Sequence, residues 1–216
     1  MNSRPSPNCG ARRNGLTPHI VVLHYTAMAD AAAALDRLCD PASEVSAHYL
    51  IDRRGEITQM VDENDRAWHA GTGEWRGLVD INSRSVGIEL DNTGRHPFPE
   101  PQMAALEDLL TGILARHPIL PEDVIGHSDM APGRKSDPGP RFDWARLARR
   151  GLAGPMAGHA DTPRNFRAAA RAAGFTADVD DETLLAATRL RFAPWRNGPV
   201  CDADCRLWYS AGDVPR

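Results

Sequence analysis

The chain lacks the features that mark membrane-spanning and nucleic-acid-binding proteins. No apolar run among its 216 residues approaches the roughly 20 that a membrane helix needs. A formal net charge of −4 gives no general attraction to nucleic acid or to an anionic membrane surface. Residues 1–17 are polar and contain no apolar segment of a secretory signal. We therefore expect a cytoplasmic protein, or a periplasmic or outer-membrane-associated one if a leader has been removed.

Cysteine is also scarce, and the four that are present form no known metal or redox motif. Cys9, Cys39, Cys201 and Cys205 show neither zinc-finger spacing nor a Cys-x-x-Cys pair. Cys201 and Cys205 are four residues apart and would share one face of a helix. Reduced thiols are the favoured prediction there, with a local disulfide or an adventitious metal as the alternatives.

What the chain does contain is an ordinary globular composition, 42% hydrophobic and 25% charged, with strand and helix patterns that alternate. Two short β-type runs flank Arg53-Arg54-Gly55, which has the chemistry of a hairpin turn. The predicted elements are strands at 19–25, 48–52, 56–61, 85–90 and 124–126, and helices at 27–38, 101–117 and 142–150. This order predicts an α/β fold with a mixed central β-sheet flanked by helices.

The composition changes after Arg150. The small residues of 151–158 are typical of a linker, so we predict a first domain over 1–150, a linker over 151–160 and a small helical domain over 161–216. Helices are expected there at 162–173, 181–192 and 202–210. About fifty residues bury little core alone, so this bundle should lean on the first domain.

Two histidines and one aspartate suggest a metal site. His24 ends an apolar strand, His127 follows a short strand, and Asp137 precedes a proline. Two imidazoles and one carboxylate suit an open zinc site whose fourth position is left for water, and such a site hydrolyses its substrate. Each residue alone has a structural alternative, such as packing for the histidines or an Asp-Pro-Gly turn. Their joint occurrence favours the metal site, and cobalt or nickel would fit the same ligands.

Six motifs in sequence order resemble one family of hydrolases. They are His24-Tyr25-Thr26, Val-Ser-Ala-His-Tyr-Leu-Ile at 45–51, Arg-Ala-Trp-His-Ala-Gly at 66–71, Ser-Val-Gly-Ile-Glu-Leu at 85–90, Gly-His-Ser-Asp at 126–129 and Lys-Ser-Asp-Pro-Gly-Pro at 135–140. Together they resemble the zinc-dependent N-acetylmuramoyl-L-alanine amidases of the AmpD and AmiD type, whose fold is related to peptidoglycan recognition proteins. The resemblance covers residues 6–150. It implies cleavage of the amide between the lactyl group of N-acetylmuramic acid and L-alanine of the stem peptide, with peptidoglycan or a muropeptide as substrate.

The resemblance assigns the metal ligands and two catalytic residues. His24, His127 and Asp137 fall on the three zinc-ligand positions, which implies one Zn²⁺ per chain. Glu89 falls on the catalytic glutamate, where a carboxylate beside the metal can move a proton from water to the departing amine; the alternative is a surface salt bridge. Lys135 falls on a lysine that stabilises the tetrahedral intermediate, since positive charge there is useful as the oxyanion develops; the alternative is a solvated loop cation. Some relatives carry a catalytic tyrosine where this chain has Ala47.

Other residues are candidates for substrate contacts. His69 should line the groove, because the Ala-Gly that follows lets a ligand come close, although a core position is the alternative. Trp68 is either packing or a platform for sugar. Asn92 and Arg95 follow the Glu89 strand and could face the peptide. His48 fits structural hydrogen bonding better than a site role.

The tail and the reaction leave alternatives open. Residues 166–209 faintly resemble the three-helix peptidoglycan-binding domain of AmiD-type amidases, and a purely structural appendage is the alternative. A non-catalytic recognition module or a metallohydrolase acting on another amide are the competing functions. Non-catalytic relatives lose a zinc ligand, whereas this chain keeps all three together with Glu89, which favours the enzyme.

Overall fold

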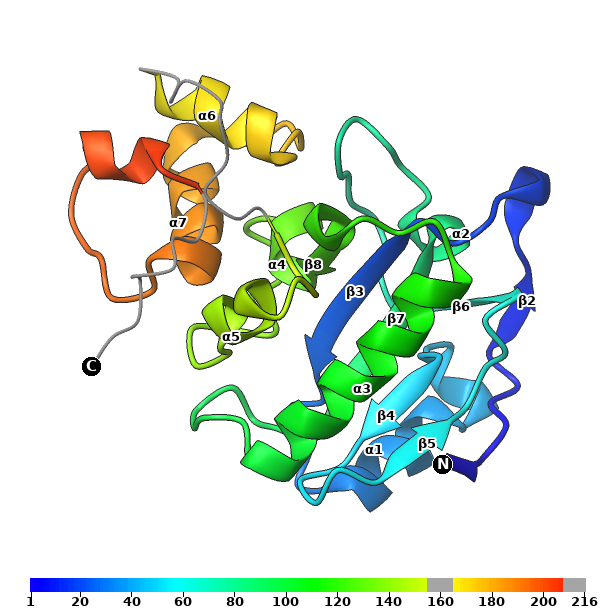
Figure 1. The fold of residues 1–216 in the computed structure, drawn as a ribbon. Coiled ribbons are helices and arrows are strands. Elements are labelled where there is room, and N and C mark those ends of the chain that lie inside the picture. Colours follow the sequence, from blue (N-terminus) through cyan, green and yellow to red (C-terminus); the bar gives the residue numbers. More distant parts are fainter. Residues whose placement is uncertain (155–164, 208–216) are drawn as a thin grey trace.

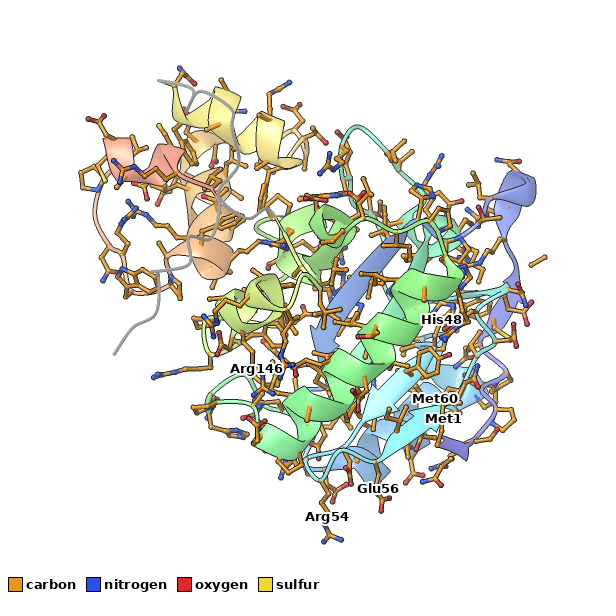
Figure 2. All side chains as sticks on the ribbon, in the orientation of Figure 1. Met1, His48, Arg54, Glu56, Met60 and Arg146 are labelled. Atoms are coloured by element: carbon orange, nitrogen blue, oxygen red, sulfur yellow. The ribbon has the colours of Figure 1, made fainter. Side chains whose placement is uncertain are left out.

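The computed structural model describes residues 1–154 and 165–207, and a six-stranded sheet lies at its centre (Figure 1). In spatial order the strands are β1 (Asn2–Ser3), β5 (Ile57–Gln59), β4 (Tyr49–Ile51), β7 (Ser85–Leu90), β3 (Ile20–Tyr25) and β8 (Val124–Gly126). The β4–β5 pair is antiparallel and the other neighbours are parallel. The predicted mixed sheet is confirmed, as is the hairpin, whose turn carries Arg54 and Glu56 outward (Figure 2).

Helices cover both faces of this sheet. The helices of the first 150 residues are α1 (Ala31–Leu38), α2 (Ile81–Arg84), α3 (Glu100–Arg116), α4 (His127–Met130) and α5 (Trp144–Arg149). On one face α3 packs Leu106 and Leu110 against Leu23 and Ile88. Figure 1 shows α3 in front of the sheet and α1 behind it. Strands buried on both faces read as near-continuous apolar runs, which is how β3 and β7 stood out in the sequence.

The second face of the sheet positions the polar residues of interest. Side chains alternate along a strand, so Leu23 points toward α3 and its neighbour His24 points to the opposite face. In the register of β3 and β7, His24 lies beside Glu89, and Leu50 of β4 lies on the other side of Glu89. The packing of α1 with Leu50 places α1 on this same face. The sequence pattern thus brings His24 and Glu89 together at the carboxyl ends of parallel strands.

The predicted helix over 27–38 begins four residues late. Its first residue is Ala31, because the Asp30 carboxylate accepts the Ala33 N–H at 2.8 Å and caps the helix. Ala27 has a φ of 52°, which is outside the helical region. The segment before Asp30 is therefore a loop, and the alanine-rich composition extended the prediction too far.

Several short elements carried no clear sequence pattern. The strands β2 (Cys9–Ala11) and β6 (Asp65–Ala67) form a separate antiparallel pair, and the four-residue helix α4, which was not predicted, begins at His127. Short 3₁₀ turns lie at 13–15, 41–43 and 121–123. The predicted helices over 101–117 and 142–150 are confirmed with small shifts at their ends, to 100–116 and 144–149.

The C-terminal region is helical, as predicted. It contains α6 (Phe166–Ala173) and α7 (Asp181–Phe192), and the helix predicted over 181–192 has these bounds. Of the third helix, predicted over 202–210, the described residues 202–207 contain a 3₁₀ turn over Asp202–Cys205. The described residues exclude 155–164 and 208–216. Most of the predicted linker lies in the first of these gaps, as does the start of the helix predicted over 162–173. The end of the helix predicted over 202–210 lies in the second. The domain boundaries stay a prediction.

All four cysteines are free thiols in this structure. Cys201 is exposed and Cys205 is buried, so the two do not share one face of a helix. Within residues 1–154 and 165–207, no helix combines the length and apolar character needed to cross a membrane.

Candidate active site

His24, His127 and Asp137 converge, although 113 residues separate the first from the last. The Nδ1 atoms of the two histidines are 2.9 Å apart, and Asp137 Oδ2 is 2.9 Å from His24 Nδ1 and 3.0 Å from His127 Nδ1. All three residues are buried. They form a group that could hold a metal ion.

Local backbone structure holds His127 and Asp137 together. The Ser128 N–H donates to the Asp137 carbonyl at 3.0 Å, so α4 fixes the backbone of the third ligand. Gly126 makes the close approach possible, because a Cβ at that position would lie 2.8 Å from Pro138 Cδ. The residue before His127 therefore needs to be glycine for Asp137 to reach the site.

A chain of hydrogen bonds fixes the proton positions on His24. Ser85 Oγ donates to the Ile81 carbonyl at 2.7 Å, so it accepts from His69 Nε2 at 3.1 Å. The other ring nitrogen of neutral His69, Nδ1, then accepts from His24 Nε2 at 3.0 Å. Burial, with the nearby charge of His127, lowers the pKa of His24 to about 4, so His24 is neutral near pH 7. Its Nδ1 atom is thus left with a free lone pair that faces Asp137.

His127 is oriented in the same way. Its Nε2 atom lies 2.8 Å from the Ala70 carbonyl, which can only accept, so Nε2 carries a proton, and a ring with a single proton leaves Nδ1 bare. Metal-binding histidines usually donate their second ring N–H to such a partner. Two bare nitrogens and a carboxylate oxygen at about 3 Å repel one another unless a cation lies between them.

The dimensions of this group suit zinc. Zinc–nitrogen and zinc–oxygen distances near 2.1 Å in a tetrahedral centre separate neighbouring ligand atoms by about 3.4 Å. The observed separations of 2.9–3.0 Å are a few tenths of an ångström tighter, with the correct donor atoms facing inward. A cavity of about 390 Å³ opens on the three ligands, so a fourth position is accessible from solvent.

Glu89 lies beside this group on the neighbouring strand. Its Oε2 atom is buried and has no hydrogen-bond partner among the described residues. Burial, reinforced by the charge of Asp137, raises the pKa of Glu89 to about 8, and Lys135 opposes the shift. A buried carboxylate without a protein partner, aimed into a cavity, is available to a water or a substrate. The alternative of a surface salt bridge does not describe this residue, since none of the ion pairs of the described residues includes it.

The cavity brings together most of the predicted site residues. Trp68, His69, Glu89 and Lys135 line it along with the three ligand candidates. Lys135 is exposed and forms no ion pair within the described residues. The cavity wall is completed by residues from β3, α1, the loops that follow them and the 134–136 loop; they are Tyr25, Thr26, Ala27, Met28, Ala34, Arg37, Leu38, Val45, Ser46, Arg134 and Ser136.

His69 and His48 differ in their positions. His69 lines the cavity, but both of its ring nitrogens are engaged by His24 and Ser85, so its main contact is with a ligand candidate. His48 has the structural role that its strand suggested: its Nδ1 accepts the Gly87 N–H at 2.9 Å. It is fully buried, and it does not line the cavity.

Asn92 and Arg95 are not brought to the cavity. Asn92 is fully buried, and its side chain is used within its own loop, accepting the Gly94 N–H and approaching His96. Arg95 is exposed and is absent from the cavity wall. A contact of either residue with the peptide stays a prediction that the geometry does not favour.

Sequence reasoning missed Arg134 and Arg37. The Arg134 guanidinium donates to the carbonyls of Ala70 and Thr72, and it thereby holds the segment whose Ala70 carbonyl orients His127. Because its partners are main-chain atoms, no pairing of residue types in the sequence could reveal it. Arg37 lies on α1, where it looked like an ordinary surface residue of a helix.

A comparison with known protein families identifies the family of the chain. The model of the Amidase_2 family, described as N-acetylmuramoyl-L-alanine amidase, matches residues 14–140, more than half of the 216-residue chain. The chain belongs to this family. The matched residues include the three ligand candidates, Glu89 and Lys135, so the family assignment and the geometry refer to the same cavity.

Individual amidases show the same similarity. The chain is 42% identical over 149 residues to the N-acetylmuramoyl-L-alanine amidase AmiD of Escherichia coli, covering 62% of this chain and 53% of AmiD. It is 46% identical over 103 residues to the 1,6-anhydro-N-acetylmuramyl-L-alanine amidase AmpD of Haemophilus influenzae, covering 47% of this chain and 56% of AmpD. The matches thus span little more than half the length of these two relatives.

A solved structure extends the similarity to the C-terminal helices. The complex of E. coli AmiD with the substrate anhydro-N-acetylmuramic acid-L-Ala-D-γ-Glu-L-Lys superposes with a TM-score of 0.78 at 32% sequence identity, and covers 94% of this chain and 90% of that one. Coverage this high extends the similarity of fold beyond residues 1–150 into the C-terminal region.

Proposed function

We propose that this protein is a zinc-dependent N-acetylmuramoyl-L-alanine amidase, which hydrolyses the amide between the lactyl group of N-acetylmuramic acid and L-alanine of the stem peptide. Its place would be in peptidoglycan turnover or recycling. The observation that supports this most strongly is the cavity in which three inward-facing ligand atoms lie next to the unpartnered carboxylate of Glu89. Family membership supplies the substrate class.

His24, His127 and Asp137 would hold the zinc ion. When bound there, zinc would supply Lewis acidity, which activates water near neutral pH and polarises the amide carbonyl. The protein's own contribution is to keep both Nδ1 atoms unprotonated: His69 fixes His24, and the Ala70 carbonyl fixes His127.

Glu89 acts as the general base and then as the general acid. It takes a proton from the attacking water as the C–O bond forms, and it delivers that proton to the amide nitrogen as the C–N bond breaks. A group with a pKa near the working pH performs both transfers well. Burial raises the pKa of Glu89 to about 8. A cation in the neighbouring site would lower this pKa toward neutral pH, because it favours the ionised carboxylate.

Positive side chains around the cavity suit the charge of the transition state and of the substrate. Lys135 at the cavity mouth can approach the carbonyl oxygen as negative charge develops on it. Arg37, at the α1 side of the cavity, has no ion-pair partner within the described residues. The substrate seen with AmiD contains an acidic residue, D-γ-Glu, whose carboxylate Arg37 could receive. Trp68 offers an apolar surface in the same wall.

Mass spectrometry of defined muropeptides tests this function. Anhydro and reducing forms are incubated with the full chain, with and without a chelator. We expect release of the stem peptide, its loss on chelation and its return when zinc is added. Cleavage that persists in chelator would overturn the metal mechanism. Zinc binding without release from any substrate would indicate a recognition module instead, and comparison of the two forms reports the preference for anhydro-muropeptides.

Location in the cell belongs to the same proposal. A cytoplasmic enzyme would act on imported fragments, whereas a periplasmic or outer-membrane-associated one would meet polymeric peptidoglycan. Fractionation of the native host, followed by detection of the protein with an antibody, separates the two.

A further inference from the structure

The short helix α4 connects the metal site to the C-terminal helices. Its first residue is the ligand candidate His127, and the N–H of its second residue, Ser128, holds the Asp137 backbone. Its third residue, Asp129, points the other way and accepts the Gly126 N–H at 2.8 Å through Oδ2. The Asp129 carboxylate thus closes the turn from which His127 projects.

A buried arginine of α7 binds this carboxylate. Arg191 Nη1 donates to Asp129 Oδ2, and both side chains are 1% exposed. Arg191 Nη2 donates to the carbonyls of Val124 and Gly154 at 3.1 and 2.6 Å. The guanidinium also lies over the Trp144 ring, 4.1 Å from its centroid. One side chain from the C-terminal region therefore contacts β8, α4, α5 and the segment after α5.

Apolar packing surrounds this contact. Met130 of α4 and Ile125 of β8 belong to the same hydrophobic cluster as Leu184 and Ala187 of α7. Phe175, which follows α6, packs edge-on against Trp75 with ring centroids 5.3 Å apart. The C-terminal helices share a core with the first 150 residues, so α4 is enclosed between the sheet and α7.

We infer that the C-terminal helices form part of the scaffold of the metal site, and that Arg191 is a positioning residue for His127 and Asp137 that acts through Asp129. The inference rests on the metal centre of the proposed function. Its physical basis is that a four-residue helix has little stability of its own. Without Arg191 the orientation of α4 depends on weaker contacts. Because α4 carries His127 and holds the Asp137 backbone, the positions of two of the three ligands then depend on those weaker contacts as well.

The test compares two arginines of the same helix. Arg191→Met removes the contact with α4, whereas the control Arg189→Met removes a paired arginine whose partner Asp204 lies within the C-terminal region. The zinc Kd of each metal-free full-length variant is measured by competition with a chromophoric chelator, and the unfolding midpoint is measured in urea. Loss of an outer contact of a metal ligand typically weakens affinity by about 10- to 100-fold. We expect at least a tenfold rise in the zinc Kd for Arg191→Met and a change of less than about twofold for Arg189→Met.

A double variant keeps the test decisive if Arg191→Met fails to fold. Asp129→Asn combined with Arg191→Met leaves no unpaired charge, and the amide oxygen of asparagine can still accept the Gly126 N–H. We expect this protein to fold and still to bind zinc at least tenfold more weakly than wild type. A wild-type Kd in a folded Arg191→Met or double variant would overturn the inference. The test measures zinc affinity and not turnover. If the wild-type protein binds zinc but cleaves no muropeptide, the proposed amidase activity is wrong, and the inference about Arg191 is still tested by the zinc Kd.

Discussion

Replacing Glu89 with glutamine should nearly abolish turnover and at the same time stabilise the metal-free protein. Glutamine keeps the shape of the side chain but cannot take a proton from water, and general acid–base catalysis contributes roughly 10²- to 10⁴-fold to rate. We expect kcat to fall by a factor in that range while zinc content is unchanged, because Glu89 is not among the ligand atoms.

The expected gain in stability follows from the pKa of Glu89. Burial raises this pKa from 4.5 to about 8 in the folded protein. An acid with a raised folded pKa opposes folding once the pH exceeds its unfolded value, and the penalty grows until the pH reaches the folded value. At pH 7 the difference is on the order of 3 kcal/mol, since each pKa unit corresponds to about 1.4 kcal/mol. Glutamine removes this penalty, so the gain should be absent below about pH 4 and largest near pH 8.

Urea unfolding of the chelator-treated proteins between pH 4 and pH 8 measures this difference, and muropeptide hydrolysis measures turnover. The matched control is Glu56→Gln, an exposed glutamate at the β4–β5 turn, which should change neither quantity (Figure 2). Near-normal turnover of Glu89→Gln would show that another group is the base. If Glu89→Gln and wild type have the same stability at every pH in this range, burial does not raise the pKa of Glu89 in the folded protein.

Three further predictions concern neighbouring groups. Lys135→Met should lower kcat by roughly 10²-fold and leave the zinc Kd unchanged; a rise in KM alone would reduce Lys135 to a binding residue. His69→Ala should weaken zinc binding by about tenfold, because the His24 Nε2–H loses its acceptor, whereas a residue that only contacts substrate would change KM and leave the zinc Kd intact. Burial opposes ionisation of Glu63, but hydrogen bonds from Arg116, Tyr49 and His117 hold its pKa at about 2. The stabilisation by ionised Glu63 is present above pH 4.5 and is lost as the pH falls toward 2. The urea midpoint of Glu63→Gln should therefore vary less with pH over that range than the midpoint of wild type. Identical pH profiles of the two proteins would refute this role of Glu63.

The sequence predicted those parts of the fold that depend on long periodic patterns. The buried runs of β3 and β7 and the apolar face of α3 read correctly because a strand covered on both faces or a long amphipathic helix leaves a signal over many residues. It failed where one local contact decides the outcome. The start of α1 depends on the Asp30 cap, and the helix at His127 is only four residues long.

The candidate site was predictable for a similar reason. Glycine and proline contexts bounded His24, His127 and Asp137, and the motifs around them resembled one family. The supporting contacts were not predictable, since Arg134 binds main-chain carbonyls and Arg191 pairs with an aspartate 62 residues away. Such partners become visible only when the chain has folded. His69 shows the same limit: it lines the cavity, as its motif indicated, but its hydrogen bonds with His24 and Ser85 could not be read from the sequence.

X-ray absorption spectroscopy of the zinc-loaded protein tests the central claim most directly. We predict one zinc per chain with only nitrogen and oxygen in the first shell, at about 2.0–2.1 Å, two of the ligands being imidazoles. Replacing His127 with alanine should remove one imidazole and most of the bound metal. A zinc–sulfur distance of about 2.3 Å would place the ion at the cysteines instead, and it would contradict the site built from His24, His127 and Asp137.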